Sequence, residues 1–256
     1  MFNVGDYVTR KKYNHDIVFK IKEIINNKVI LHGVDVRICA DCNKDDLEKV
    51  IYKKKLNRIS NIKEIVKNDF FYIPGLILHI DSDEEYIKMC KEFYEKQQVN
   101  YVHYQVEEKE LKNKVIHLIE KHNPNIIVIT GHDAYQKNGT YRNSKYYIET
   151  VKEIRKIFNN EIIIISGACQ SDFIGLIKSG STFASSPKKI NIHALDPAIV
   201  ASYLALTNNY DEVDIKDILS KTTYGEDGIG GTITKGAMKV CYPRINKGEI
   251  WTSIIL

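Results

Sequence analysis

The chain has 256 residues, enough for one large domain or for one large and one small domain. Hydrophobic residues make up 43% of it and charged residues 27%, as is typical of a globular protein that folds around its own core. No apolar run approaches the roughly 18 residues of a membrane-spanning helix, and the first residues lack the basic and apolar regions of a secretory signal. We therefore expect the five scattered cysteines to be free thiols in a reducing compartment, the cytoplasm.

The net charge of +4 is concentrated near the N-terminus. Residues 1–68 contain 15 Lys and Arg against 9 Asp and Glu, whereas the remaining residues contain 22 against 24. Such a basic segment favours solubility, and it is also typical of a surface that docks onto an acidic or polymeric partner. Because the excess is modest and no recognition motif accompanies it, the sequence does not favour nucleic-acid binding.

The first 52 residues predict a small β module. Short β-branched runs alternate with turn residues such as Asn26 and Asn27, which is typical of a small barrel or a curled sheet. The polar, lysine-rich segment 53–69 predicts a linker, so residues 70–256 form the second domain. The expected strands of the module are 4–8, 16–21, 28–33 and 34–39.

From residue 70 onward, strand and helix patterns alternate. This alternation predicts an α/β domain with a mostly parallel sheet and helices on both faces. The expected strands are 76–80, 99–106, 126–130, 162–165, 181–185 and 190–195. The first expected helix follows the capping residues Asp81, Ser82 and Asp83 and continues to about residue 97. The other expected helices are 107–122, 144–158, 170–178 and 197–206, the last capped by Asp196.

Two of the strands end in chemically capable side chains. Residues 126–130 and 162–165 are short Ile- and Val-rich runs, typical of strands that are buried on both faces. The first is followed by His132 and the second by Cys169. One helix joins the two strands, so we expect them to be neighbours in the sheet and to bring both side chains to the same edge.

A thiol beside an imidazole is a nucleophile with its base. At the start of a helix, the thiol pKa is lowered by the helix dipole and by a nearby imidazole. Backbone N–H groups at the same turn, including that of Cys169, are suited to an oxyanion hole. Taken alone, a cysteine is more often a buried, inert thiol. The interpretation as a catalytic pair therefore depends on His132 and Cys169 occurring together.

Other interpretations stay open. His193 follows Cys169, which is the order found in amidotransferase-like cysteine hydrolases. A non-catalytic scaffold that docks through the basic N-terminal module is a third interpretation. Cys39 and Cys42 have the spacing of a metal-ligand pair, but no second pair exists, so we expect no metal and no cofactor. The glycine-rich segment 227–231 matches no nucleotide fingerprint and predicts a flexible loop near the site.

The arrangement of His132 and Ala168-Cys169 after consecutive strands resembles the caspase-like cysteine peptidases of clan CD. A more specific resemblance, covering nearly the whole chain, is to the YabG family of sporulation peptidases. The stretches that carry it are VGDYVTR (4–10), GHDAY (131–135), SGACQSD (166–172), IHALDP (192–197) and DGIGG (227–231).

The resemblance to these families implies a cysteine endopeptidase with His132 as base and Cys169 as nucleophile. It implies cleavage of spore coat and cortex-related proteins after arginine, self-processing, and action in the mother cell in association with the coat. Caspase-like enzymes usually have glycine after the catalytic histidine, and its N–H helps to form the oxyanion hole. Here Asp133 occupies that position. An arginine pocket needs a carboxylate, and the candidates are Asp172, Asp133 and Asp196.

Overall fold

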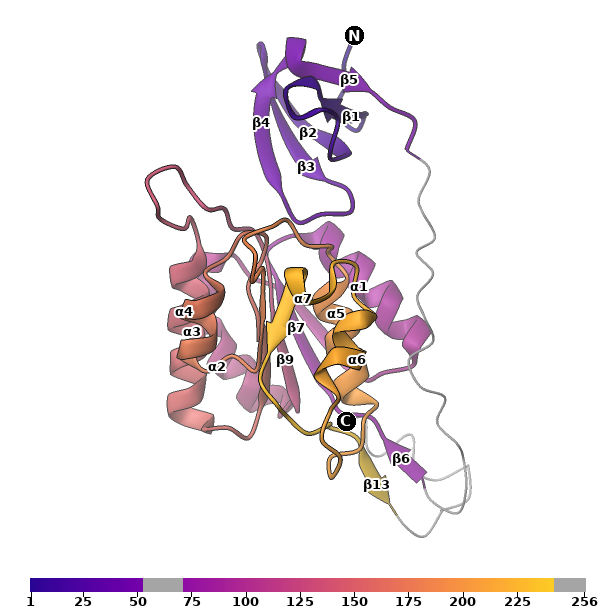
Figure 1. Ribbon diagram of the computed structural model, residues 1–256, viewed down its shortest axis with the longest axis vertical. Coiled ribbons are helices and arrows are strands. Elements are labelled where there is room, and N and C mark those ends of the chain that lie inside the picture. Colours follow the sequence, from indigo (N-terminus) through magenta and orange to yellow (C-terminus); the bar gives the residue numbers. More distant parts are fainter. Residues whose placement is uncertain (53–70, 242–256) are drawn as a thin grey trace.

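The structure is a computed structural model, and it describes residues 1–52 and 71–241. An N-terminal module of antiparallel strands sits on a larger α/β domain (Figure 1). The predicted linker 53–69 lies outside the described residues. Within the described ranges, none of the helices is long and apolar enough to cross a membrane.

The N-terminal module is a five-stranded antiparallel sheet in the order β4-β3-β2-β1-β5. Alternate side chains of its strands point inward and form a small core, as strands with one buried face require. The prediction for 28–33 is confirmed, whereas the strand predicted at 34–39 is wrong, because residues 34–38 leave the sheet as a loop. The strands are β1 Tyr7–Arg10, β2 Phe19–Ile25, β3 Lys28–Gly33, β4 Cys39–Asn43 and β5 Leu47–Lys49.

The α/β domain contains a six-stranded sheet in the order β12-β11-β10-β9-β7-β8. All neighbouring strands run parallel except β12, which is antiparallel to β11. The central strand β9 is fully buried, as its uninterrupted Ile and Val run predicts. The strands are β7 Ile77–Asp81, β8 Tyr101–Gln105, β9 Ile126–Ile129, β10 Ile163–Ser166, β11 Phe183–Ser185 and β12 Ile229–Gly231.

Helices cover both faces of this sheet (Figure 1). α1 (Glu84–Gln97), α5 (Asp196–Ala205) and α6 (Ile215–Ser220) lie on one face, and their apolar side chains form one core with the strands. α2 (Leu111–His122), α3 (Ser144–Phe158) and α4 (Phe173–Ser179) cover the other face and form the second core. Each fully buried Leu, Ile or Phe side chain contributes about 1.5–3 kcal/mol, so the sheet is anchored from both sides. The remaining elements are α7 Gly225–Gly228 and the pair β6 Phe71–Ile73 and β13 Lys239–Cys241.

Local sequence patterns predicted one helix and one helix cap correctly. The predicted helix 144–158 is α3, residue for residue, and Asp83 caps α1 by accepting the N–H of Glu85. Asp196, however, is the first residue of α5, and Leu195 occupies the cap position.

Two predictions near the carboxyl edge of the sheet are wrong. Residues 190–195 form no strand of the sheet; His193 instead makes an isolated antiparallel bridge with Val36 of the module. The segment 227–231 is not a loop, because it ends α7 and then forms the edge strand β12 against β11. Both segments take their structure from partners that are distant in sequence.

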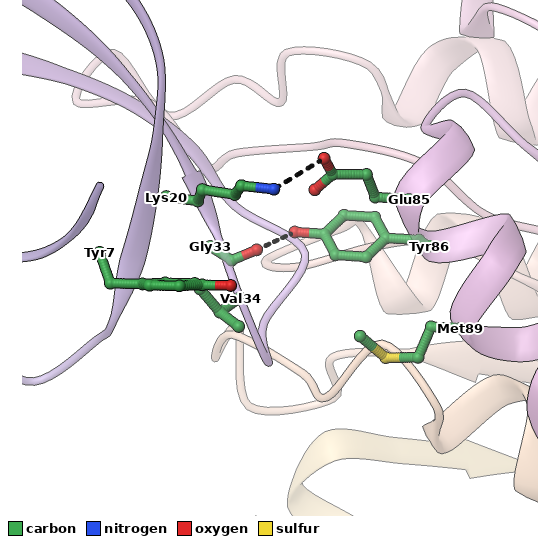
Figure 2. Close-up of a pocket in the computed structure, with 7 residues that line it drawn as sticks. All are labelled: Tyr7, Lys20, Gly33, Val34, Glu85, Tyr86 and Met89. Carbon is green, nitrogen blue, oxygen red and sulfur yellow. Dashed lines mark hydrogen bonds and ion pairs between the residues drawn. The ribbon is translucent and has the colours of Figure 1, made fainter. Parts of the chain in front are cut away.

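The module contacts the α/β domain along α1, and a pocket of about 110 Å³ lies between them (Figure 2). The hydroxyl of Tyr86 donates to the carbonyl oxygens of Gly33 and Val36 at 2.8 and 2.7 Å, which holds the base of the loop 34–38. Lys20 and Lys22 form ion pairs with Glu85 at 3.6 and 2.7 Å. The module is therefore held against the carboxyl edge of the sheet, where the candidate side chains lie.

Candidate active site

The strands β9 and β10 place His132 and Cys169 at corresponding positions. The parallel register pairs Ile129 with Ser166, and each candidate side chain lies three residues beyond its member of that pair. The register therefore confirms that the two strands are neighbours and that both residues follow the same edge of the sheet.

Each of the two turns contains a glycine in a crowded position. A Cβ atom on Gly131 would lie 2.6 Å from Glu108 Oε1, and one on Gly167 would lie 2.8 Å from Leu176 Cδ1. Gly167 also adopts a φ of 103°, which side-chain-bearing residues rarely do. Gly131 directly precedes His132, and Gly167 stands two residues before Cys169, so each strand ends in a glycine-containing turn just before its candidate residue.

His132 lies in a cluster of polar and aromatic groups beneath the N-terminal module. Its Nε2 is 3.5 Å from the Sγ of Cys39 and 3.4 Å from the Oδ2 of Asp83. The ring of Tyr86 lies 5.8 Å away, edge to face. Nδ1 of His132 is buried and has no hydrogen-bond partner among the described residues. The imidazole is thus engaged through one nitrogen by a cysteine other than Cys169.

Cys169 is completely buried. Its Sγ accepts a hydrogen bond from the backbone N–H of Ile192 at 3.3 Å. Burial raises the pKa of the thiol to about 12, although the N–H of Ile192 and the positive charge of Arg37 oppose this rise. In this state the thiol is therefore neutral at physiological pH, and a reactive thiolate requires that its surroundings change.

Asp83 has a second role that its capping position did not predict. Its Oδ2 lies 3.0 Å from Nδ1 of His32 as well as 3.4 Å from Nε2 of His132. Burial would raise the pKa of Asp83, but hydrogen bonds from both imidazoles hold it well below its usual value. Asp83 is therefore a carboxylate that holds one histidine of the module and one of the α/β domain.

Asp133 joins three segments of the site. Its carboxylate accepts the N–H groups of Ala134 and Asn143 at 2.8 and 2.7 Å, and the hydroxyl groups of Ser144 and Ser171. Burial raises its pKa. The side chain thus fixes the loop after β9 to the start of α3 and to the turn after Cys169.

We expect Asp133→Asn to lower the free energy of unfolding by about 2 kcal/mol, because an amide cannot accept all of these hydrogen bonds and leaves a buried donor unsatisfied. Urea denaturation measures the change. The exposed Asp16→Asn is the matched control, with a change within about 0.5 kcal/mol. A loss of arginine preference without loss of stability would instead assign Asp133 to substrate binding.

The other predicted acids also have partners within the fold. Asp172 caps α4 by accepting the N–H of Gly175 at 3.0 Å. Asp196 is buried and accepts the N–H of Thr223 at 2.8 Å, and burial raises its pKa. Their part in an arginine pocket stays a prediction. His193 accepts the N–H of Leu195 through Nδ1 at 3.1 Å, and burial lowers its pKa.

Several residues of the site were not found from the sequence. Arg37 and Asp81 form an ion pair, and both are completely buried. Asp81 is the last residue of β7, the same kind of position that drew attention to His132 and Cys169. Its place at the end of a buried strand could therefore have identified Asp81 as a candidate site residue. Arg37 lies in a loop between two short strands, and nothing in its local pattern distinguishes it.

The cysteine pair of the module lies on β4 at the edge of the five-stranded sheet. Cys39 points to His132, as described above, and burial raises its pKa to about 12. Burial also raises the pKa of Cys42. Within the described ranges, no group of three or more His, Cys, Asp or Glu side chains is arranged to hold a metal ion.

Comparison with known proteins gives a consistent assignment. Residues 3–69 and 52–243 match the family model described as YabG peptidase U57. The chain is 36% identical over 284 residues to the sporulation-specific protease YabG of Bacillus subtilis (strain 168), an alignment that covers 94% of this chain and 98% of that protein. Among solved structures, a response regulator receiver protein from Pseudomonas putida aligns with a TM-score of 0.32 and 12% identity, over 46% of this chain and 88% of that one.

The family match spans most of both domains, and the identity to the Bacillus protease extends over nearly the full length of each chain. The strand ends that carry His132 and Cys169 lie within the matched residues. The chain is a peptidase that belongs to the YabG peptidase U57 family of sporulation proteases.

Proposed function

We propose that the chain is a cysteine endopeptidase with a caspase-like catalytic arrangement, in which Cys169 is the nucleophile and His132 the general base. The observation that carries this proposal is the register of β9 and β10, which sets the two residues at matching positions beyond neighbouring strands. The N–H of Ile192 at 3.3 Å from Sγ adds support, since a donor at this position stabilises a thiolate.

The proposed reaction proceeds through a thioester. His132 accepts the proton of the Cys169 thiol, and the sulfur attacks the carbonyl carbon of the scissile bond. The N–H groups of Cys169 and Asp133 hold the negative oxygen of the tetrahedral intermediate, each contributing about 3 kcal/mol. His132 then gives its proton to the leaving amine, and water hydrolyses the thioester to regenerate the thiol.

The proposed substrates are proteins of the spore coat and cortex, cut after arginine, and the chain itself is included through self-processing. The support is the relationship to a protease named as sporulation-specific. We place the protein in the mother-cell cytoplasm in association with the coat, where the basic residues of the N-terminal module serve for docking. The alternative of a non-catalytic scaffold has no specific observation in its favour.

The test is covalent labelling with a peptide chloromethyl ketone that carries arginine next to the reactive group. We expect the label on the peptide fragment that contains Cys169, with labelling lost in Cys169→Ala and retained in Cys42→Ala. A matched reagent with glutamate in place of arginine should label at least about tenfold more slowly, because a carboxylate pocket repels it. Mass spectrometry locates the label. Labelling of a serine, or of Cys39 alone, would contradict the proposed nucleophile.

A further inference from the structure

One loop of the N-terminal module lies on the candidate active site. This covering loop comprises residues 34–38 between β3 and β4. Its backbone pairs with an extended segment of the α/β domain: the N–H of Arg37 donates to the carbonyl of Ile192 at 3.4 Å, and the N–H of Ala194 donates to the carbonyl of Asp35 at 3.1 Å. This antiparallel pairing is the way in which an extended peptide binds along a protein edge.

The side chain of Arg37 fills a closed pocket at the carboxyl edge of the sheet. Its guanidinium is paired with Asp81, and its Nε and Nη2 donate to the carbonyl of Ala194 at 3.2 and 2.8 Å. The ring of Tyr86 lies 4.9 Å from the guanidinium carbon. The carboxylate, the carbonyl and the aromatic face that surround this forked cation form a pocket suited to arginine.

The covering loop and Cys39, the first residue of β4, together run past both candidate catalytic groups. Ile192, whose carbonyl accepts the N–H of Arg37, donates its own N–H to the Sγ of Cys169 at 3.3 Å. Two residues after Arg37, the Sγ of Cys39 lies 3.5 Å from Nε2 of His132. The chain from Arg37 to Cys39 therefore extends from the proposed nucleophile to the proposed base, as the scissile region of a bound substrate would.

We infer that Asp81 is the residue that selects arginine in the substrate, and that Arg37 of the covering loop occupies the same pocket in the free protein as a built-in competitor. The inference rests on the proposed function and deepens it. Asp81 takes the role for which Asp172, Asp133 and Asp196 were candidates. Displacement of the covering loop is then the step that admits a substrate.

Arg37 competes effectively with a substrate because it belongs to the same chain as the pocket. A segment tethered near its site has an effective concentration in the millimolar range, so a free peptide at micromolar concentration competes poorly. Cys169 is completely buried beside the Ile192 backbone that pairs with this loop, and Cys39, the first residue after the loop, contacts His132. A protease that acts on a large assembly is kept inactive in this way until a partner or a high local substrate concentration displaces the loop.

The test is steady-state hydrolysis of a fluorogenic arginine peptide by the full chain and its variants. Arg37→Gln removes the competing cation, so we expect the apparent KM to fall at least about tenfold while kcat stays within about twofold. Lys22→Gln is the matched control: it breaks an exposed ion pair between the module and α1 without touching the pocket, and its KM should equal that of the parent. A KM that falls equally in Lys22→Gln would overturn the inference, because general loosening of the module would explain it.

Two further measurements test the inference even if Arg37→Gln does not fold. Arg37→Lys keeps the positive charge but loses the fork, and its KM should lie between those of the parent and Arg37→Gln. A free peptide that copies residues 33–40 should inhibit the parent and the variants competitively, whereas the same peptide with glutamine in the arginine position should not. Equal inhibition by the two peptides would overturn the inference.

Asp81→Asn tests the specificity directly. We expect kcat/KM for the arginine peptide to fall about 10²-fold and the preference for arginine over glutamine to disappear, because a neutral amide no longer pairs with the guanidinium. An unchanged preference would overturn the assignment of Asp81 while the labelling of Cys169 by the arginine reagent still supports the proposed function. If no protein hydrolyses any peptide and the reagent does not label Cys169, the proposed function itself fails.

Discussion

Replacing Cys169 with alanine is expected to lower kcat/KM for an arginine peptide by at least about 10⁴-fold, the loss that follows removal of an enzyme's nucleophile. The oxyanion donors and the substrate pocket remain in this variant, so a small residual rate is expected. The side chain is fully buried but small, and its removal costs only about 1 kcal/mol of stability. Initial rates measured beside a thermal unfolding curve separate the two effects.

Alanine variants of the two cysteines on β4 test whether the loss of activity is specific to Cys169. Cys42 lies on the same strand as Cys39 but packs against the core of the N-terminal module, and Cys42→Ala should retain the activity of the parent. Cys39→Ala removes a contact between the module and the proposed base, and we expect activity to persist. Full activity in Cys169→Ala together with its loss in Cys39→Ala would exchange the roles of the two thiols, since Cys39 is the one in contact with His132 in this state.

Alkylation of Cys169 in the substrate-free protein is expected to be about 10³-fold slower at neutral pH than that of an ordinary cysteine. Burial raises the pKa of this thiol from 9.0 to about 12, and only the thiolate reacts. The sign follows from the raised pKa: the reactive fraction is smallest at low pH and rises about tenfold for each pH unit, with no plateau near pH 9.

Timed reaction with iodoacetamide between pH 7 and 10, followed by mass spectrometry of the fragment that contains Cys169, measures this rate. N-acetylcysteine in the same tube is the control for the reagent. If the covering loop is the cause of the burial, Arg37→Gln should react faster than the parent at every pH. A rate of alkylation that reaches a plateau near pH 7 in the parent would mean that Cys169 is already a thiolate in the folded protein. That result would contradict the expectation that burial keeps the thiol protonated.

His132 contacts both the N-terminal module and the α/β domain. Nε2 of His132 is shared between Cys39 and Asp83, and Nδ1 has no partner among the described residues. A base held in this way is not yet arranged for Cys169. In the proposed mechanism, displacement of Cys39 together with the covering loop would leave Asp83 as the carboxylate beside His132, a position suited to stabilising an imidazolium.

The sequence by itself determined where the two candidate catalytic residues lie in the sheet. Uninterrupted Ile and Val runs followed by small residues identify β9 and β10, and the single helix between them makes them parallel neighbours. His132 and Cys169 then reach one edge of the sheet whatever the rest of the chain does. These signals are local, because a run of adjacent Ile and Val residues predicts burial on both faces and the small residues that follow predict the end of the strand.

Only the tertiary structure decided what lies opposite that edge. Arg37 and Asp81 belong to different domains, and their pairing depends on how the module docks on α1. The same docking turns residues 190–195 from a predicted strand into the partner of the covering loop. Periodicity reports which face of an element is buried, but it carries no information about which distant loop buries it. The proposed recognition pocket and the arginine inside it therefore depend on packing between the module and the α/β domain rather than on any local pattern.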